Sequence, residues 1–112
     1  MTEHLGREIL LSLWKVHILH HAEEHGIYGH WMIEELAKHG YRVSPGTMYP
    51  LLARMERNGW IASKMSTGAK ARRTYTITAA GRRVLQELRE HVDELHREVV
   101  REQRQRTRKD RR

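Results

Sequence analysis

Cysteine is absent from this chain of 112 residues, and long apolar runs are absent as well. Without cysteine there is no disulfide framework, no thiolate metal site and no cysteine nucleophile. No apolar run approaches the roughly 20 residues that span a bilayer, so we expect no membrane-spanning segment. The first residues show no basic stretch followed by an apolar stretch, so we expect no secretory signal peptide and a cytoplasmic protein.

Sequence features of enzymes are also scarce. Hydrophobic residues make up 38% of the chain, enough for one modest core but not for a large buried active site. We find no glycine-rich phosphate loop after a strand, and no Ser, His and Asp in an order with a supporting motif. We therefore predict that the chain is not an enzyme and requires no cofactor.

Negative charge is nearly missing from two segments, and this separates the chain into acidic and basic parts. Residues 42–73 hold seven basic residues and one acidic residue, whereas residues 101–112 hold seven basic and two acidic residues. They carry net charges of +6 and +5, and the acidic remainder of the chain reduces the total to +7. Segregated positive charge is typical of proteins that bind nucleic acid. For the C-terminal segment alone, a merely solvated basic tail is an equally good interpretation.

Apolar periodicity predicts three helices in the first half of the chain, over residues 3–24 and 29–39 and from Thr47 onwards. The first is apolar on more than one face, which indicates that a second subunit covers part of it. For the third, we expect Ser44-Pro45-Gly46 to form a tight turn and Thr47 to be the cap. Pro50 would then lie in the first helical turn, where its missing N–H is not needed.

Two short strands and a last helix are predicted in the second half. Residues 60–65 and 72–77 have the pattern of a hairpin with a basic tip, and Thr78 is the expected cap of the helix that follows. Apolar residues in this helix are spaced 3, 4, 3, 4, which indicates a seam against a partner helix. The seam comprises Leu85, Leu88, Val92, Leu95 and Val99. Residues 104–112 are expected to be disordered.

The predicted order is helix, helix, helix, hairpin, long helix. The predicted fold is therefore mainly α with a small two-stranded β-wing: a winged helix-turn-helix domain (1–77), a C-terminal dimerisation helix (78–103) and a disordered basic tail (104–112). In such folds the third helix enters the major groove of DNA and the hairpin lies along the flanking backbone.

Four stretches of sequence carry a family resemblance. They are Tyr28-Gly29, Ser44-Pro45-Gly46-Thr47-Met48-Tyr49-Pro50-Leu51-Leu52, Asn58-Gly59-Trp60-Ile61 and Arg72-Arg73-Thr74-Tyr75-Thr76-Ile77-Thr78-Ala79-Ala80-Gly81. The chain resembles PadR-family transcriptional regulators over about residues 5–100. The resemblance implies a dimeric repressor whose C-terminal helix packs on the partner's N-terminal helix. Because only one helix follows the wing, the chain is similar to the compact subgroup of the family, and an effector would have to bind at the dimer interface.

The DNA-binding residues predicted from this arrangement lie on the third helix, just before it and on the wing. They are Arg42, Gly46, Thr47, Tyr49, Arg54, Lys64, Lys70, Arg72 and Arg73. Basic wing residues suit phosphates, while hydroxyls on the helix suit phosphates or base edges. The alternatives are a packing role for Tyr49 and a solvated charged loop for the wing. A two-fold dimer implies an operator with an inverted repeat. The alternative function is non-specific, architectural binding of double-stranded DNA.

The dimer interface is predicted to combine Leu10 and Trp14 with the five seam residues of the last helix. Two effector classes are considered. His17, His21 and His25 share a helix face at i, i+4 and i+8, a spacing that permits a divalent metal site. Trp14 and Trp31 would stack on a planar aromatic effector, as the family resemblance suggests. The plainer alternatives are helix-end capping or packing for the histidines and core packing for both tryptophans.

Overall fold

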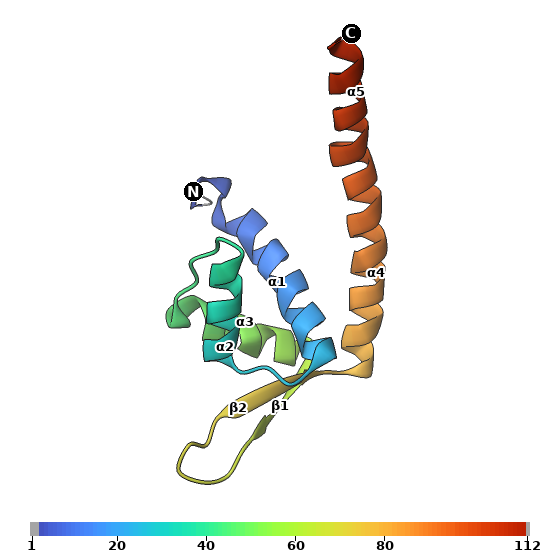
Figure 1. Cartoon of the computed structure of the whole chain (residues 1–112). Helices are drawn as coiled ribbons and strands as arrows, with labels where there is room; N and C mark the ends of the chain where they lie inside the picture. The colour runs from blue at the N-terminus through green and yellow to red at the C-terminus, as the bar shows by residue number, and fades with distance from the viewer. Residues whose placement is uncertain (1–2, 112) are drawn as a thin grey trace.

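Three helices and a hairpin form the body of the protein, and a long C-terminal helix extends away from it (Figure 1). The computed structural model describes residues 3–111. The body contains α1 (Arg7–Glu24), α2 (Gly29–Lys38), α3 (Pro45–Arg57), β1 (Ile61–Met65) and β2 (Arg73–Ile77). It is followed by α4 (Ala79–His96), η2 (Arg97–Glu102) and α5 (Gln103–Asp110). The predicted winged helix architecture is confirmed.

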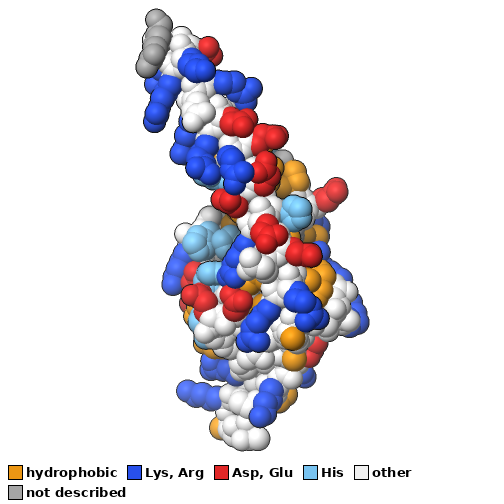
Figure 2. Space-filling model, turned by 90° about the vertical axis from the view of Figure 1, so that its right-hand side faces the viewer, with side chains coloured by type: hydrophobic (Ala, Val, Ile, Leu, Met, Phe, Trp, Pro, Cys, Tyr) orange, Lys and Arg blue, Asp and Glu red, His pale blue; other side chains and the backbone are white. Residues whose placement is uncertain are grey.

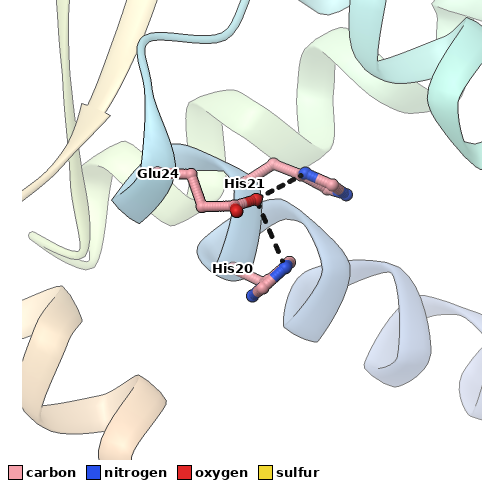
Figure 3. A group of neighbouring side chains, drawn as sticks. All are labelled: His20, His21 and Glu24. Carbon is pink, nitrogen blue, oxygen red and sulfur yellow. Dashed lines mark ion pairs between the residues drawn. The ribbon is translucent and has the colours of Figure 1, made fainter.

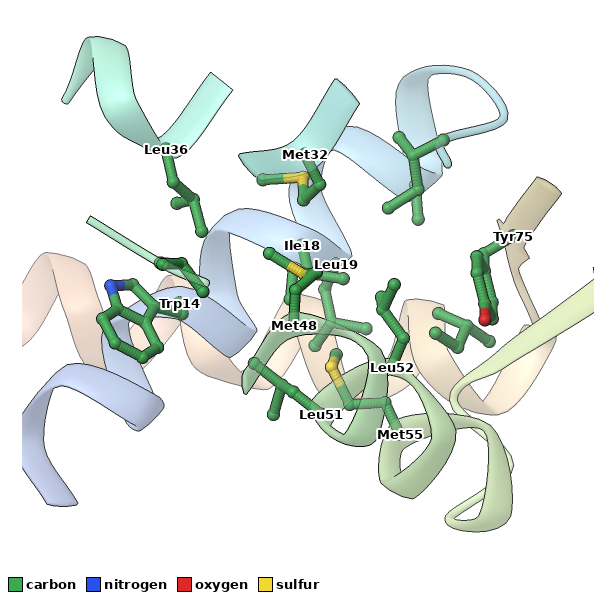
Figure 4. Packing of buried hydrophobic residues seen from close by; sticks show 14 of the residues in the cluster. Trp14, Ile18, Leu19, Met32, Leu36, Met48, Leu51, Leu52, Met55 and Tyr75 are labelled. Atoms are coloured by element: carbon green, nitrogen blue, oxygen red, sulfur yellow. The ribbon is translucent and has the colours of Figure 1, made fainter. Parts of the chain in front are cut away.

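The core lies where α1, α2 and α3 meet, and the hairpin closes one side of it (Figure 4). Each helix contributes an apolar stripe at helical spacing, and the strands contribute Ile61, Tyr75 and Ile77. The buried side chains of α3 fix which face of that helix points outward. They are Met48, Leu51, Leu52 and Met55.

The predicted first helix is interrupted near its start. Gly6 has a φ of 85° and separates a short 3-10 turn, η1 (Glu3–Leu5), from α1. A glycine adopts this left-handed backbone without the steric cost that a Cβ imposes. The expectation of one helix from residue 3 was therefore wrong, whereas its end, before Gly26, agrees with the structure.

The start of α3 also differs from the prediction. The helix begins at Pro45 with Ser44 as its N-cap residue, so Thr47 is not the cap. Pro45 suits the first helical turn because its fixed φ is already helical and its missing N–H needs no partner. Pro50 consequently lies inside the helix rather than in its first turn. The carbonyl group it leaves without an i+4 donor belongs to Gly46, an exposed residue that water can reach.

The two strands pair in antiparallel fashion with Ile61 opposite Ile77 and Met65 opposite Arg73. The link between α1 and α2 joins this sheet as an isolated bridge, because Ile27 and Tyr75 exchange two backbone hydrogen bonds of 2.9 and 2.7 Å. The wing is thereby held to the helical body by this bridge between β2 and the α1–α2 link.

The C-terminal helix starts as predicted. Thr78 caps α4, since its hydroxyl oxygen accepts a hydrogen bond of 3.0 Å from the Gly81 amide. The chain then continues through the π-helical segment η2 into α5, which ends at Asp110. Residues 104–110 are thus helical, in contrast to the disorder expected for 104–112; residue 112, like residues 1–2, lies outside the described part.

Candidate nucleic-acid interface

The exposed face of α3 presents the residues expected to meet DNA. Gly46, Tyr49 and Arg54 are exposed, and Thr47 is half-buried beside them. The Ser44 hydroxyl donates to the Thr47 hydroxyl oxygen over 3.3 Å. Because the helix begins at Pro45, its positive dipole end lies beside Gly46 and Thr47. This end of α3 is therefore suited to an anionic ligand.

Tyr49 packs against α2 and is also partly exposed on the surface of α3. Its ring lies against Gly29 at the first turn of α2, so close that a Cβ at position 29 would collide with the ring. The side chain nevertheless remains 47% exposed. Tyr49 thus packs α3 against α2 and still presents polar surface outward.

The basic residues of the wing divide between its two faces. The strand register places Arg73 on the same face as Ser63, whereas Lys64 lies opposite Thr74 on the other face. Lys70 is exposed in the loop at the tip, and Arg42 is exposed in the loop before α3. The structure therefore does not bring Lys64 to the face that carries Arg73.

Arg73 belongs to a polar network that ties the wing to the end of α3. Its guanidinium donates to the Ser63 hydroxyl oxygen over 2.9 Å. The Ser63 hydroxyl and backbone amide in turn donate to one carboxylate oxygen of Glu56, over 2.7 and 2.9 Å. These two hydrogen bonds, the side-chain one foremost, hold the pKa of Glu56 below its ordinary value.

A groove of about 660 Å³ connects the wing to the helices. It is lined by the start of α2, by Tyr49 of α3 and by both sides of the wing, and its residues include Tyr28, His30, Arg72 and Arg73. The Arg72 guanidinium lies 4.2 Å from the centre of the Tyr28 ring, a cation–π contact that orients it. The sequence predicted neither Tyr28 nor His30 as part of the site, although Tyr28 belongs to one of the stretches behind the family resemblance.

Positive charge gathers at the two ends of the molecule, as the space-filling view shows (Figure 2). Basic side chains occupy the wing at the bottom and the C-terminal helix at the top, and most of the acidic side chains in this view lie between them, mixed with further basic ones. The molecule measures 65 × 31 × 21 Å. The α3 and wing surface and the α5 surface are thus well separated within one chain.

The apolar residues expected at a dimer interface prove to have two different locations. Leu10 and Trp14 are buried in the chain's own core, and so is Leu85. By contrast Val92, Leu95 and Val99 are 50%, 61% and 55% exposed. That stripe of α1 packs into the core of the single chain, which is the plainer alternative considered for Trp14, and a place for Leu10 and Trp14 in a dimer interface stays a prediction.

A second stripe of α1 carries the exposed apolar residues instead. Leu13 and Val16 line one wall of a groove of about 580 Å³, and Leu85 and Val92 of α4 line the other. Ile9, one turn before Leu13, is 55% exposed. The pattern that made α1 apolar on more than one face thus serves both the core and this groove.

The histidines predicted to share a metal do not converge as expected. The His17 ring lies 5.0 Å from that of His39, whereas the rings of His21 and His25 are in contact with Trp31 at 5.3 and 4.8 Å. Within the described residues, the one group with metal-ligand spacing is His20, His21 and Glu24. Burial lowers the pKa of both His17 and His21, against the opposing attraction of Glu35.

The two tryptophans also do not share contacts. Trp14 is buried and makes an edge-to-face contact with Tyr41, at 6.3 Å between ring centres. Trp31 is half-buried against the histidines at the end of α1. Trp14 is therefore a core residue, as the plainer alternative expected, and an effector pocket that combines it with Trp31 at a dimer interface stays a prediction.

Comparison with known proteins identifies the family. The family model described as the transcriptional regulator PadR-like family matches residues 18–87. The chain belongs to the PadR-like family of transcriptional regulators. It is 46% identical over 95 residues to the transcriptional regulator Rv3488 of Mycobacterium tuberculosis, an alignment that covers 84% of this chain and 89% of the relative.

Solved PadR-family structures share the fold. A PadR family transcriptional regulator from Eggerthella lenta is 32% identical, with a TM-score of 0.69 over 82% of this chain and 86% of that one. A PadR-like transcriptional regulator from Bacillus cereus is 28% identical, with a TM-score of 0.75 over 82% and 92% of the two chains. Across residues 3–111, no helix has both the length and the apolarity needed to traverse a bilayer.

Proposed function

We propose that this PadR-family chain is a homodimeric repressor that binds an inverted-repeat operator in double-stranded DNA and is released by an effector. The observation that carries the proposal is the continuous surface formed by the exposed face of α3, the groove beside it and the basic wing. We further propose that it acts in the cytoplasm and is a regulator rather than an enzyme, in keeping with its relatives.

The geometry suggests a division of labour on DNA. The start of α3 would enter the major groove, with Gly46 allowing close approach and Arg54 reaching base edges or phosphate further along. Arg72 and Arg73 border the groove beside α3, where a phosphate strand would meet them together with the first turn of α2. Lys70 at the wing tip would contact the flanking backbone, and Arg42 the backbone before α3.

Dimerisation would cover the apolar groove between α1 and α4. A second copy could place its own exposed seam residues, Val92 and Leu95, against the groove wall that includes Leu13. This pairing would remove exposed apolar area from water in both chains. A two-fold dimer would hold two copies of α3 facing half-sites about one helical turn, roughly 34 Å, apart.

Two effector classes are open to such a dimer. A planar aromatic compound would need an apolar space, which the groove between α1 and α4 offers more readily than the buried Trp14. A divalent metal would need histidine and carboxylate ligands, which lie at the end of α1. Either ligand would lie beside the proposed dimer interface rather than on the DNA-facing surface.

The test starts with a pool of random duplex DNA, from which the duplexes that bind the full-length protein are isolated. Anisotropy of a selected labelled duplex, titrated with excess random competitor at two salt concentrations, should give saturable binding that resists competition. Footprinting should reveal an inverted repeat, and transcription from a promoter carrying it should fall when protein is added. Binding that disappears with competitor would overturn the specific regulator.

The alternative, an architectural DNA binder, is favoured by the basic residues of α5. A chain ending at residue 102 distinguishes the two functions, because α5 buries no side chain and its removal should leave the fold intact. A specific regulator should lose affinity but keep its preference for the selected operator. An architectural binder should lose nearly all binding, in which case recognition by residues 46–54 would be wrong.

A further inference from the structure

Three ligand-type side chains converge at the C-terminal part of α1 (Figure 3). Their ligand atoms all lie within 4.8 Å of one another. One Glu24 oxygen is 3.3 Å from the His20 Nε2 atom and 3.4 Å from the His21 Nδ1 atom. The spacings from the histidines to Glu24, i+4 and i+3, place them on one side of the helix.

His21 is oriented as metal-bound histidines usually are. Its Nδ1 atom is buried and makes no hydrogen bond, although it faces Glu24. Its other ring nitrogen, Nε2, lies 3.6 Å from a carboxylate oxygen of Glu35 on α2. A carboxylate behind the second nitrogen is a common arrangement for a ligating histidine; here Glu35 accepts its hydrogen bond from His39, over 3.3 Å, and lies slightly farther from His21. The unpartnered atom is thus the one that points into the cluster.

Access to this cluster comes from one side. The side chains of His20 and Glu24 are 48% and 52% exposed, whereas that of His21 is only 14% exposed. An ion could reach all three from solvent, with His21 as the fixed ligand and the other two closing around it. The Glu23 carboxylate pairs with Arg89 over 2.9 Å and partly offsets its positive charge, while Glu35 lies 3.6 Å from His21.

We propose that His20 Nε2, His21 Nδ1 and the Glu24 carboxylate bind one divalent transition metal ion of the zinc type, with water as a fourth ligand. Two imidazoles and a carboxylate suit Zn²⁺, Co²⁺, Ni²⁺ and Cu²⁺, and they disfavour Mg²⁺ and Ca²⁺, which prefer oxygen ligands. Three protein ligands with one open position are also a familiar zinc set. The site uses His21 from the predicted trio but replaces His17 and His25.

Metal binding at His20 would change a contact between α1 and α4. Arg89 of α4 holds two groups of α1: its guanidinium lies 2.9 Å from Glu23 and 3.4 Å from the Nδ1 atom of His20. To accept from Arg89, Nδ1 must be unprotonated, so the proton of neutral His20 lies on Nε2. A metal on Nε2 moves that proton to Nδ1, which can then no longer accept from Arg89.

The ion therefore withdraws Arg89 from His20 and leaves it with Glu23 alone. His20 and Arg89 both line the groove between α1 and α4, so the metal alters the wall against which the second copy is proposed to pack. The metal site stands on the cluster alone, whereas its role as the effector site rests on the DNA-binding function proposed above.

The test titrates untagged full-length protein, without DNA, with Co²⁺ and with Zn²⁺. Co²⁺ should give visible absorption bands at one ion per chain, and calorimetry with Zn²⁺ should give the same stoichiometry. His20→Ala and Glu24→Gln change exposed side chains and should fold normally while weakening binding at least 100-fold. Glu35→Gln should weaken it by about 10- to 100-fold through His21.

The matched controls are His30→Ala and Glu34→Gln. His30 and Glu34 form another i, i+4 pair, with 2.8 Å between Nε2 and Oε1, but no third ligand joins them among residues 3–111. The His30→Ala and Glu34→Gln variants should bind metal as the wild type does. Equal losses in both pairs, or unchanged binding in His20→Ala and Glu24→Gln, would overturn the site.

The tautomer provides a second readout. Long-range ¹H–¹⁵N spectra should assign the His20 proton to Nε2 in the metal-free protein and to Nδ1 with Zn²⁺ bound. An unchanged tautomer would overturn the link to Arg89. Anisotropy with operator DNA then tests the effector role separately: metal-free protein that binds operator and loses affinity with Zn²⁺ supports it, and an unchanged affinity overturns it. Metal-free protein that binds no operator contradicts the proposed function instead.

Discussion

Glu56 links the end of α3 to the wing through Ser63, and its charge is part of that link. Because its folded pKa lies below the ordinary value of 4.5, its contribution to stability is present above that value and is lost as the pH falls through the folded pKa. We expect Glu56→Gln to destabilise the protein by about 1–2 kcal/mol at pH 7 and by progressively less as the pH falls below 4.5.

Urea unfolding at a series of pH values measures this difference. The control is Glu90→Gln, an exposed position of α4, which should leave the free energy of unfolding nearly unchanged at every pH. A Glu56→Gln effect of the same size at pH 3 and pH 7 would mean that shape, and not charge, accounts for the contribution of this residue.

Two glycines separate a structural requirement from a functional one. A Cβ at Gly81 would collide with the Trp60 carbonyl oxygen, so Gly81→Ala should destabilise the fold by about 1–3 kcal/mol or more. At Gly46 the nearest atom to a Cβ is the Ser44 hydroxyl oxygen at 3.7 Å. Gly46→Ala should therefore keep or raise stability and weaken operator binding, which thermal melts and anisotropy would measure. Unchanged affinity would place DNA away from Gly46.

At the residue scale, the sequence predicted interactions between neighbouring residues better than contacts between residues that are far apart in the chain. The Thr78 cap follows from a hydroxyl just before an apolar repeat, and the structure confirms it. The histidines could not be grouped from spacing alone, because His39 and Glu35 reach them from another helix. The contact between Arg89 and Glu23 could likewise not be predicted, since 66 residues separate the two along the chain.

At the scale of elements, the wing and α3 should contribute differently to DNA binding. Lys70→Ala at the wing tip removes one phosphate contact, so the slope of log affinity against log salt should fall by about 0.9 for every sequence. Arg54→Ala on α3 should instead cost about 1–3 kcal/mol on the operator and relax the choice of base. Anisotropy at several salt concentrations, with operator and mutated operator, measures both. Identical behaviour of the two variants would contradict this division.

Elements with one clean periodicity were predicted well, and elements shaped by a single backbone group were not. The bounds of α2 and of both strands follow from the sequence to within a residue, because caps and alternation agree there. The break at Gly6 and the start of α3 at Pro45 depend on individual backbone conformations. The C-terminal tail is helical because it continues the helix begun by α4, whereas its polar, charged composition had predicted disorder.

At the scale of the whole molecule, α1 contributes to the proposed DNA binding, dimerisation and metal binding. One stripe of it builds the core that positions α3, and another lines the groove facing α4. Its C-terminal end carries the proposed metal ligands. Sequence periodicity revealed that α1 has more than one apolar face but not which residues face which neighbour, since that depends on how the helices cross.

The exposed part of the α4 seam provides the decisive test of the dimer. Val92→Glu with Leu95→Glu places two charges on a surface that the single chain leaves open, so the fold should survive. The dimer should dissociate because those charges would be buried at its interface. Operator affinity should then fall by about 10²- to 10⁴-fold, since the second half-site no longer binds within the same molecule.

Light scattering and anisotropy measure the two effects. Gln86→Glu, an exposed change on the face of α4 away from the seam, should alter neither. If the doubly substituted chain is still a dimer at micromolar concentration, the interface lies elsewhere. If it is a monomer with wild-type affinity, recognition does not need two half-sites.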